Sequence, residues 1–142
     1  MNAPQSPAAV KLSTDALAPP GWAVAVTRAA NALTFFPALL VSGFYGEFLL
    51  AWLQLGRAPL PSLDDPKGIP GVFVVHTAVT VLMICTPMAA LLAVASNAVA
   101  LFLKSESARF KALRVVASTA IWTLGFTFLR HDPYGVMDWW MD

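Results

Sequence analysis

Three long apolar segments dominate the pattern of hydrophobic and polar positions along the chain. The first covers residues 33–55, the second covers residues 72–103 and the third covers residues 112–129. About 20 consecutive apolar residues are enough for an α-helix to cross the hydrocarbon core of a bilayer. The pattern therefore predicts an all-α integral membrane protein with three transmembrane helices at about these positions.

The second segment is longer than a bilayer requires, since a helix over residues 72–103 would measure about 48 Å. We expect it to tilt, to project beyond the membrane or to bend. Pro87, near its middle, lacks a backbone N–H and clashes with the preceding turn, which predicts a kink at that point. The half after Pro87 is rich in alanine, so helix backbones can approach closely and we expect this half to pack against protein.

The chain before the first apolar segment has two parts. Residues 1–20 are rich in Pro, Ala and Ser and contain no long apolar run, which predicts a disordered tail that is retained in the protein. Residues 21–142 are then expected to form a single membrane-embedded helical domain. Within it, residues 21–32 form an interfacial helix or an extension of the first span, with a bend near Pro37.

The residues after the third segment predict a short C-terminal helix at the membrane interface. Asp132 is suited to cap this helix and Pro133 to be its first residue. Trp139 and Trp140 fit the interface, because an amphipathic ring is well solvated there. Together with Tyr134 they also offer a large aromatic contact area, so a docking site for a partner is the competing interpretation.

Basic residues are distributed unequally between the two sides of this topology. The side of the N-terminus and the second connection carries Lys11, Arg28, Lys104, Arg109, Lys111 and Arg114, and the opposite side carries Arg57, Lys67 and Arg130. Basic residues accumulate on the cytoplasmic side of a membrane. We therefore expect a multi-pass protein of the bacterial inner membrane, with a cytoplasmic N-terminus and a periplasmic C-terminus.

Composition narrows the class of protein further. Apolar residues make up 58% of the chain and charged residues 12%, against about 25% charged in soluble domains. A net charge of +1 is unlike the basic surface that binds nucleic acid, and the single cysteine, Cys85, allows no internal disulfide. The sequence contains no nucleophile–base pair, phosphate loop or zinc signature. We expect no metal site and no enzymatic activity of its own, although the chain could belong to an oxidoreductase complex.

Glu47 is the strongest candidate for a functional residue. A carboxylate inside a membrane span is costly and usually faces a partner, a cavity or a proton path. Gly43 and Gly46 lie close to it on the same helix and would let a neighbouring backbone approach. We predict that Gly43, Gly46, Glu47 and Asn97 contact partner helices. The residues alone leave two roles open for Glu47, the fixing of helix packing and the transfer of protons.

Two histidines suggest a second kind of site. His76 lies one turn inside the second span and His131 lies at the end of the third, and antiparallel threading places both at the outer side. Two imidazoles at similar depth are the minimum for binding a haem b, and His76 near Glu47 is also suited to line a quinone pocket. His76, Glu47 and His131 are therefore the candidate cofactor-binding residues, while the simpler expectation is that no cofactor binds.

These features favour a non-catalytic accessory or structural subunit of a larger bacterial inner-membrane complex. It would pack through the Glu47 face, the alanine-rich second helix and the tryptophan-rich C-terminus. Its partners would be the lipid bilayer and other membrane-protein subunits, or further copies of the same chain. Two alternatives are a small haem b- or quinone-binding anchor subunit of a respiratory electron-transfer complex, and a homo-oligomeric proton or ion pathway that uses Glu47.

Overall fold

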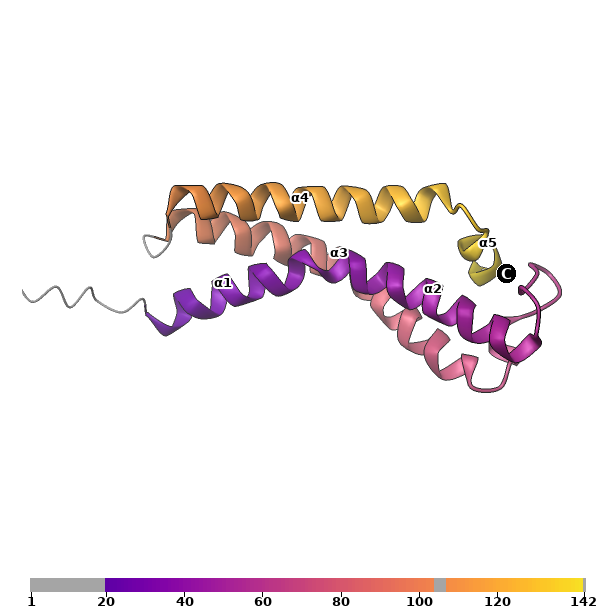
Figure 1. Ribbon diagram of the computed structural model, residues 1–142. Coiled ribbons are helices and arrows are strands. Elements are labelled where there is room, and N and C mark those ends of the chain that lie inside the picture. Colours follow the sequence, from indigo (N-terminus) through magenta and orange to yellow (C-terminus); the bar gives the residue numbers. More distant parts are fainter. Residues whose placement is uncertain (1–19, 104–106, 142) are drawn as a thin grey trace, which may run out of the picture.

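The computed structural model describes residues 20–103 and 107–141, so the predicted tail lies outside the described residues except for its last position. The described residues contain no β-strand and form α1 (Gly21–Thr34), α2 (Phe36–Leu55), η1 (Pro66–Gly68), α3 (Val72–Phe102), α4 (Ala108–His131) and α5 (Val136–Met141). Figure 1 shows α1 and α2 in succession, with α3 and α4 beside them, in one elongated bundle. The short α5 folds back at the end of the bundle where α2 connects to α3.

Three helical stretches are long and apolar enough to cross a membrane, namely Gly21–Leu55, Val72–Phe102 and Ala108–His131. The prediction of an all-helical chain with three such stretches is confirmed at this level. The first and third stretches are longer than the predicted segments 33–55 and 112–129. Hydropathy underestimates helix length here, because backbone hydrogen bonds continue into turns whose side chains are small or charged.

Pro37 determines where α1 ends and α2 begins. The residue between the two helices is Phe35 (φ −91°, ψ 0°), two positions before the proline near which a bend was predicted. Pro37 has no N–H to donate to the carbonyl of Leu33, four residues earlier. The indole Nε1 of Trp122 in α4 donates to that carbonyl instead, at 3.2 Å. α1 thus extends the first span, and α4 satisfies the backbone group that the break leaves free.

Pro87 lies inside α3 without ending it, so the predicted long second helix is a single element. Figure 1 shows α3 changing direction near its middle, alongside the bend between α1 and α2. The hydroxyl of Thr86 donates to the carbonyl of Leu82 at 2.9 Å, within the same turn region. Such side-chain to backbone bonds help a membrane helix accommodate a proline.

The alanine-rich half of α3 packs against α1 through small side chains. Ala30 of α1 has no exposed surface, and Ala93 of α3 is 3% exposed. Other small residues on the same two faces are also buried: Ala23, Ala89 and Ala100. Small side chains let helix backbones approach closely, and dispersion contacts between them replace contacts with lipid. The expectation that this half packs against protein is met for one face only, since Leu91 and Val94 on other faces are 66% and 71% exposed.

A second core lies at the opposite end of the bundle, between α2, α3 and α5. Its buried members include large side chains from all three helices, with Phe44 of α2 1% exposed and Trp139 of α5 fully buried. They form two adjoining clusters: Leu40, Phe44, Val79 and Val136, and Ala51, Ile69, Val72 and Trp139. α5 is therefore part of the folded core, and the predicted short C-terminal helix is present.

In contrast, α4 packs sparsely against the rest of the chain. Ser118 is its only buried residue among the 24 that form the helix. Only 6% of its most apolar stretch is buried, compared with 22% in each of the other two spanning stretches. The closest approach is made by Gly125, where an added Cβ would lie 2.7 Å from the Cβ of Pro37. α4 is thus attached at a few points and otherwise exposes its side chains.

Candidate functional site

Glu47, His76 and Trp140 form a buried polar group that we call the Glu47 cluster. Glu47 has none of its surface exposed. Its Oε1 lies 2.8 Å from Nδ1 of His76, and its Oε2 accepts a hydrogen bond of 3.1 Å from the indole Nε1 of Trp140. Both carboxyl oxygens are thus engaged by side chains of other helices. A buried carboxyl group with two such partners avoids most of the cost of an unpaired one.

The antiparallel arrangement of α2 and α3 brings the first two members together. Glu47 lies two turns before the end of α2, and His76 lies one turn after the start of α3. Gly43, one turn before Glu47, lets the helices approach, since an added Cβ would lie 3.1 Å from Cγ2 of Val79. The role predicted for Gly43 therefore applies to a helix of the same chain.

Asp132 positions the third member, Trp140. Its backbone adopts a left-handed conformation (φ 37°) that ends α4. Its carboxylate accepts hydrogen bonds from the backbone N–H groups of Val136, Met137 and Asp138, at 2.7, 2.8 and 3.1 Å. The predicted capping role of Asp132 is confirmed. The helix begins at Val136 rather than at Pro133, because the chain first turns through residues 133–135.

Trp139 fastens α5 to the connection between α2 and α3. Its indole Nε1 donates to the backbone carbonyl of Asp64 at 2.6 Å. The carboxylate of Asp64 accepts two hydrogen bonds from the Arg57 guanidinium, at 2.6 and 2.9 Å, and one from the N–H of Leu60, at 2.9 Å. The Arg57 guanidinium, with help from the Leu60 N–H, holds the pKa of Asp64 below its usual value.

Aromatic rings enclose the Glu47 cluster. The ring of Trp140 lies 5.0 Å from that of His76 and 4.9 Å from that of Phe44, centre to centre, the second pair being edge to face. Phe48 and Trp139 make a further edge-to-face contact at 5.5 Å. These rings exclude water from the carboxyl group and hold the imidazole in place. The cluster therefore fixes three helices relative to one another.

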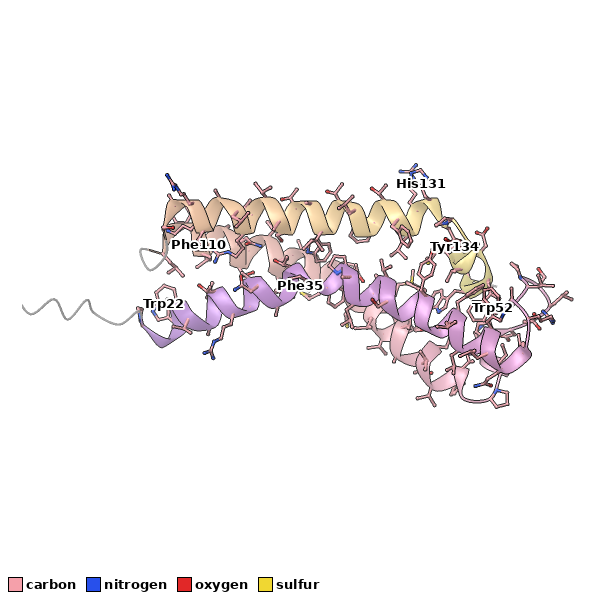
Figure 2. All side chains as sticks on the ribbon, viewed as in Figure 1. Trp22, Phe35, Trp52, Phe110, His131 and Tyr134 are labelled. Carbon is pink, nitrogen blue, oxygen red and sulfur yellow. The ribbon has the colours of Figure 1, made fainter. Side chains whose placement is uncertain are left out.

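The structure does not bring His131 to this cluster. Its side chain is exposed at the end of α4, and Figure 2 shows it pointing away from the bundle. No group of three or more His, Cys, Asp or Glu residues with the geometry of a metal site occurs among the described residues. The bis-histidine arrangement considered for a haem is therefore absent from the described part of the chain. The position of His131 in the sequence predicted its depth along the bundle, but it did not predict the direction in which the side chain points.

Of the residues predicted to contact partners, some are bonded within the chain and others lie at its surface. Trp139 and Trp140 donate hydrogen bonds within the chain, because α5 folds back onto the bundle. Tyr134 is 72% exposed and meets the ring of Tyr45 edge to face at 6.1 Å. An added Cβ at Gly46 would meet nothing within 4 Å.

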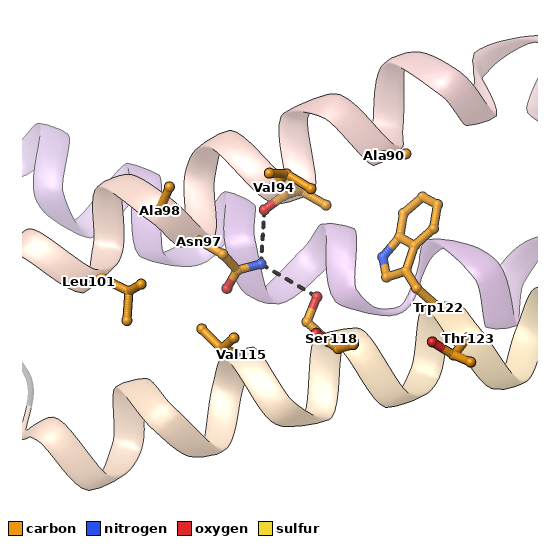
Figure 3. Close-up of a pocket in the computed structure, with 11 residues that line it drawn as sticks. Ala90, Val94, Asn97, Ala98, Leu101, Val115, Ser118, Trp122 and Thr123 are labelled. Carbon is orange, nitrogen blue, oxygen red and sulfur yellow. Dashed lines mark hydrogen bonds between the residues drawn. The ribbon is translucent and has the colours of Figure 1, made fainter.

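Asn97 lies in a second polar contact, between α3 and α4. Its Nδ2 donates to the carbonyl of Ala93 at 2.9 Å and to the hydroxyl of Ser118 at 3.4 Å. Figure 3 shows this carboxamide in the space between the two helices, with Trp122 one turn further along α4. Sequence reasoning missed Ser118, Trp122 and Gly125. Their spacing of four and three residues, which places small and aromatic side chains on one helix face, was the available signal.

Comparison of the chain with protein-family models, with curated proteins and with solved structures finds no match. Function is therefore argued from the structure and its chemistry alone.

Proposed function

We propose that the chain is a non-catalytic, membrane-embedded helical subunit of a larger bacterial inner-membrane complex. The proposal places the contact with its partner on the outer face of α4, defined as the exposed residues Leu113, Val116, Ala120, Leu124 and Thr127. These residues follow a helical spacing of three and four, and none of them lines the pocket between α3 and α4. The surfaces first considered for this role, around Glu47 and the C-terminal tryptophans, are occupied by the chain itself.

One observation carries the proposal: α4 is both less apolar and less buried than α3. The mean hydropathy of its most apolar stretch is 1.5, against 2.3 for α3, while 6% of that stretch is buried, against 22%. Contact with lipid alone favours the opposite relation, because exposed positions of a membrane helix gain most from apolar side chains. If a protein partner covers α4, the helix need not be as apolar as one that faces lipid, and its side chains are buried by the partner rather than by the rest of the chain.

Two small or hydroxyl residues on the outer face of α4 support the same conclusion. Ala120 and Thr127 are both exposed there. Residues of this kind are common where membrane helices contact one another, since they permit close approach and hydroxyl groups can form hydrogen bonds between helices. The outer face of α4 therefore includes residues that are typical of a helix interface.

The state of Glu47 supports a structural role rather than a proton pathway. A pathway requires access of protons to the carboxyl group, and this side chain has no exposed surface and two partners within the chain. In the proposed role, the Glu47 cluster keeps the α2–α3–α5 end rigid so that α4 is presented to the partner. The excess of basic residues at the opposite end supports a cytoplasmic N-terminus.

Site-specific photo-crosslinking in native membranes tests the proposal. A photoreactive amino acid is placed at Val116 or Leu124 of α4 and, as matched controls, at Ile84 or Leu91 of α3, which are 73% and 66% exposed. We expect a discrete protein adduct from the α4 positions and lipid adducts alone from the α3 positions. Lipid adducts alone at all four positions would overturn the proposed interface. An adduct of twice the chain mass would replace the accessory subunit with a homo-oligomer.

A further inference from the structure

The carbonyl oxygen of Asn97 is buried and has no hydrogen-bond partner among the described residues. The side chain is 8% exposed, and its Nδ2 already donates to Ala93 and Ser118. A carboxamide oxygen has two lone pairs, and leaving it unpaired in an apolar medium is costly. The chain thus holds an acceptor in position without supplying a donor to it.

This carboxamide lines a pocket between α3 and α4. The pocket measures about 450 Å³ and is open on one side of the bundle. Figure 3 shows small residues of α3 on one wall and Ser118, Trp122 and Thr123 of α4 on the other. Its volume lies within the range of small-molecule sites, roughly 300–1,000 Å³, and is small for a helix about 10 Å across.

A second pocket of about 450 Å³ continues the space toward the middle of the bundle. Both pockets are lined by Ala90, and the lining of the second is mostly apolar, with Thr86 and Arg130 as its polar residues. Its walls are formed by Leu40, Phe44, Met83, Pro87, Phe126 and Leu129, among others. Asn97 lies in the last two turns of α3, so its end of the groove is near one membrane surface and the second pocket is deeper. The groove therefore has a polar end near the surface and an apolar end within the membrane.

We propose that this groove, the α3–α4 groove, binds a membrane-soluble phenol or quinol with an apolar chain. The Asn97 side chain turns so that Oδ1, which is buried where it stands, meets the pocket and accepts a hydrogen bond from the ring hydroxyl. The ring then lies between the alanines of α3 and the indole of Trp122, and the apolar chain occupies the second pocket. A hydroxyl donor satisfies the unpaired acceptor, which a purely apolar lipid tail cannot do. A planar ring fits beside Trp122, because aromatic rings pack favourably at such separations.

The site is distinct from the pair considered first for a quinone, His76 with Glu47. That pair is closed by Trp140 and belongs to the other end of the bundle. The proposal concerns binding only, and it goes beyond the proposed partner contact, since the groove and the outer face of α4 use different residues of that helix.

Ligand-induced thermal stabilisation of the full chain in lipid nanodiscs tests the proposal. The probe is a hydroquinone with a decyl chain, and the matched control ligand is its dimethyl ether, which keeps the apolar body but has no O–H donor. We expect the hydroquinone to raise the unfolding temperature by several degrees and the ether to have no such effect. Equal shifts with both ligands would indicate apolar partitioning and overturn the role of Asn97.

Variants locate the effect in the groove. We expect Asn97→Leu to retain its helical content and to need at least a tenfold higher hydroquinone concentration for the same shift. Ser96→Ala is the control, because the Ser96 hydroxyl bonds to its own helix, at the carbonyl of Leu92. A shift that Asn97→Leu leaves unchanged contradicts the proposal. A chain that is dimeric and becomes monomeric in Asn97→Leu would show that a second copy occupies the groove.

Ala90→Leu provides a test that does not change the polar group. A larger side chain at this position narrows the passage between the two pockets. The wild-type chain should bind the decyl hydroquinone more tightly than a methyl hydroquinone, and the Ala90→Leu variant should bind both alike. Persistence of the chain-length preference in this variant would place the apolar chain elsewhere and overturn the proposed binding mode.

Discussion

The polar side chains at the two ends of α3 differ in how completely their atoms are hydrogen-bonded. Near the start of the helix, His76 contacts a carboxyl group whose two oxygens are both engaged, and aromatic rings from α2 and α5 enclose the pair. Near the other end, Asn97 has partners for its amide nitrogen but none for its oxygen among the described residues. At the His76 end both carboxyl oxygens of Glu47 have partners within the chain. At the other end the carboxamide oxygen of Asn97 has no donor among the described residues.

The packing around the two ends of α3 also differs. α5 covers the His76 end and supplies two indole N–H groups to the Glu47 cluster and to the neighbouring connection. At the Asn97 end the only described helices are α1, α3 and α4, and α4 makes few contacts. A buried polar side chain in a long apolar helix can thus have all its polar atoms paired within the chain, or it can have one left unpaired. The number of its hydrogen-bond partners distinguishes the two cases.

The largest expected effect comes from removing the anchor of the closed end. Trp139→Ala leaves a cavity in the core and frees the Asp64 carbonyl, so we expect a loss of about 3–5 kcal/mol in the free energy of unfolding. Trp52→Ala is the matched control, since Trp52 is 46% exposed, and should cost much less. Reversible unfolding in mixed micelles measures both values. Similar losses in the two variants would show that α5 does not stabilise the bundle.

Glu47 distinguishes a hydrogen-bonding role from a proton-transfer role. Glu47→Gln keeps an oxygen for the Trp140 N–H and offers an amide donor to Nδ1 of His76, so we expect a stability loss within about 1 kcal/mol. Glu47→Leu leaves both partners unpaired and should cost about 2–3 kcal/mol. The same unfolding measurement compares the two. A Gln variant as unstable as the Leu variant would show that the negative charge of Glu47, and not its geometry, holds the cluster together.

Gly125 tests the attachment of α4 to the rest of the bundle. In Gly125→Ala the new Cβ would lie 2.7 Å from the Cβ of Pro37, so α4 must shift at a cost of about 1–3 kcal/mol. Gly46→Ala meets nothing within 4 Å and should stabilise its helix by roughly 0.5–1 kcal/mol. The shift of α4 is followed by hydrogen exchange of its backbone amide groups in chains that keep all their tryptophans. If exchange along α4 is unchanged in Gly125→Ala, α4 does not rest on Pro37.

The smallest expected effect is the pH dependence of the connection between α2 and α3. The Arg57 guanidinium lowers the pKa of Asp64 below its usual value of about 3.9, so the pair stabilises the fold above that pH. The contribution is lost as the pH falls through the lowered pKa. Limited proteolysis of this connection should therefore accelerate below about pH 4. Asp64→Asn should be cleaved at neutral pH as fast as the wild-type chain is in acid, and an unaltered rate would contradict this role.

Hydropathy was sufficient to predict the three long apolar helices, but it located both ends of only one of them, α3. Residues 72–103 form an uninterrupted apolar run that is long enough to cross a membrane, so α3 was predictable almost to the residue. For residues 21–32 the sequence predicted a helix but left two alternatives, an interfacial helix or an extension of the first span, because the segment contains Arg28 and Asn31. The structure joins α1 and α2 into one stretch and packs α1 on α3. Likewise, Pro37 predicted a break, whereas the position of the break at Phe35 depends on how Trp122 satisfies the freed carbonyl.

The candidate site shows the same division. Glu47 was identifiable in the sequence because a single carboxyl group among apolar residues is costly, and His76 because of its depth in the next segment. Their hydrogen bond, and the indole that completes it, required the fold: Trp140 lies 93 positions from Glu47 in the chain. The C-terminal tryptophans were equally suited to the membrane interface and to a core, and local sequence does not distinguish these environments.

The amino-acid sequence by itself determined the number of long helices that are apolar enough to cross a membrane and the residues that are costly to bury, because these follow from the transfer free energies of side chains along one chain. Only the tertiary structure decided which of the costly residues are paired. Closure of α5 over Glu47 and His76, and the open oxygen of Asn97, arise from contacts between distant segments, whose direction and distance no local pattern encodes.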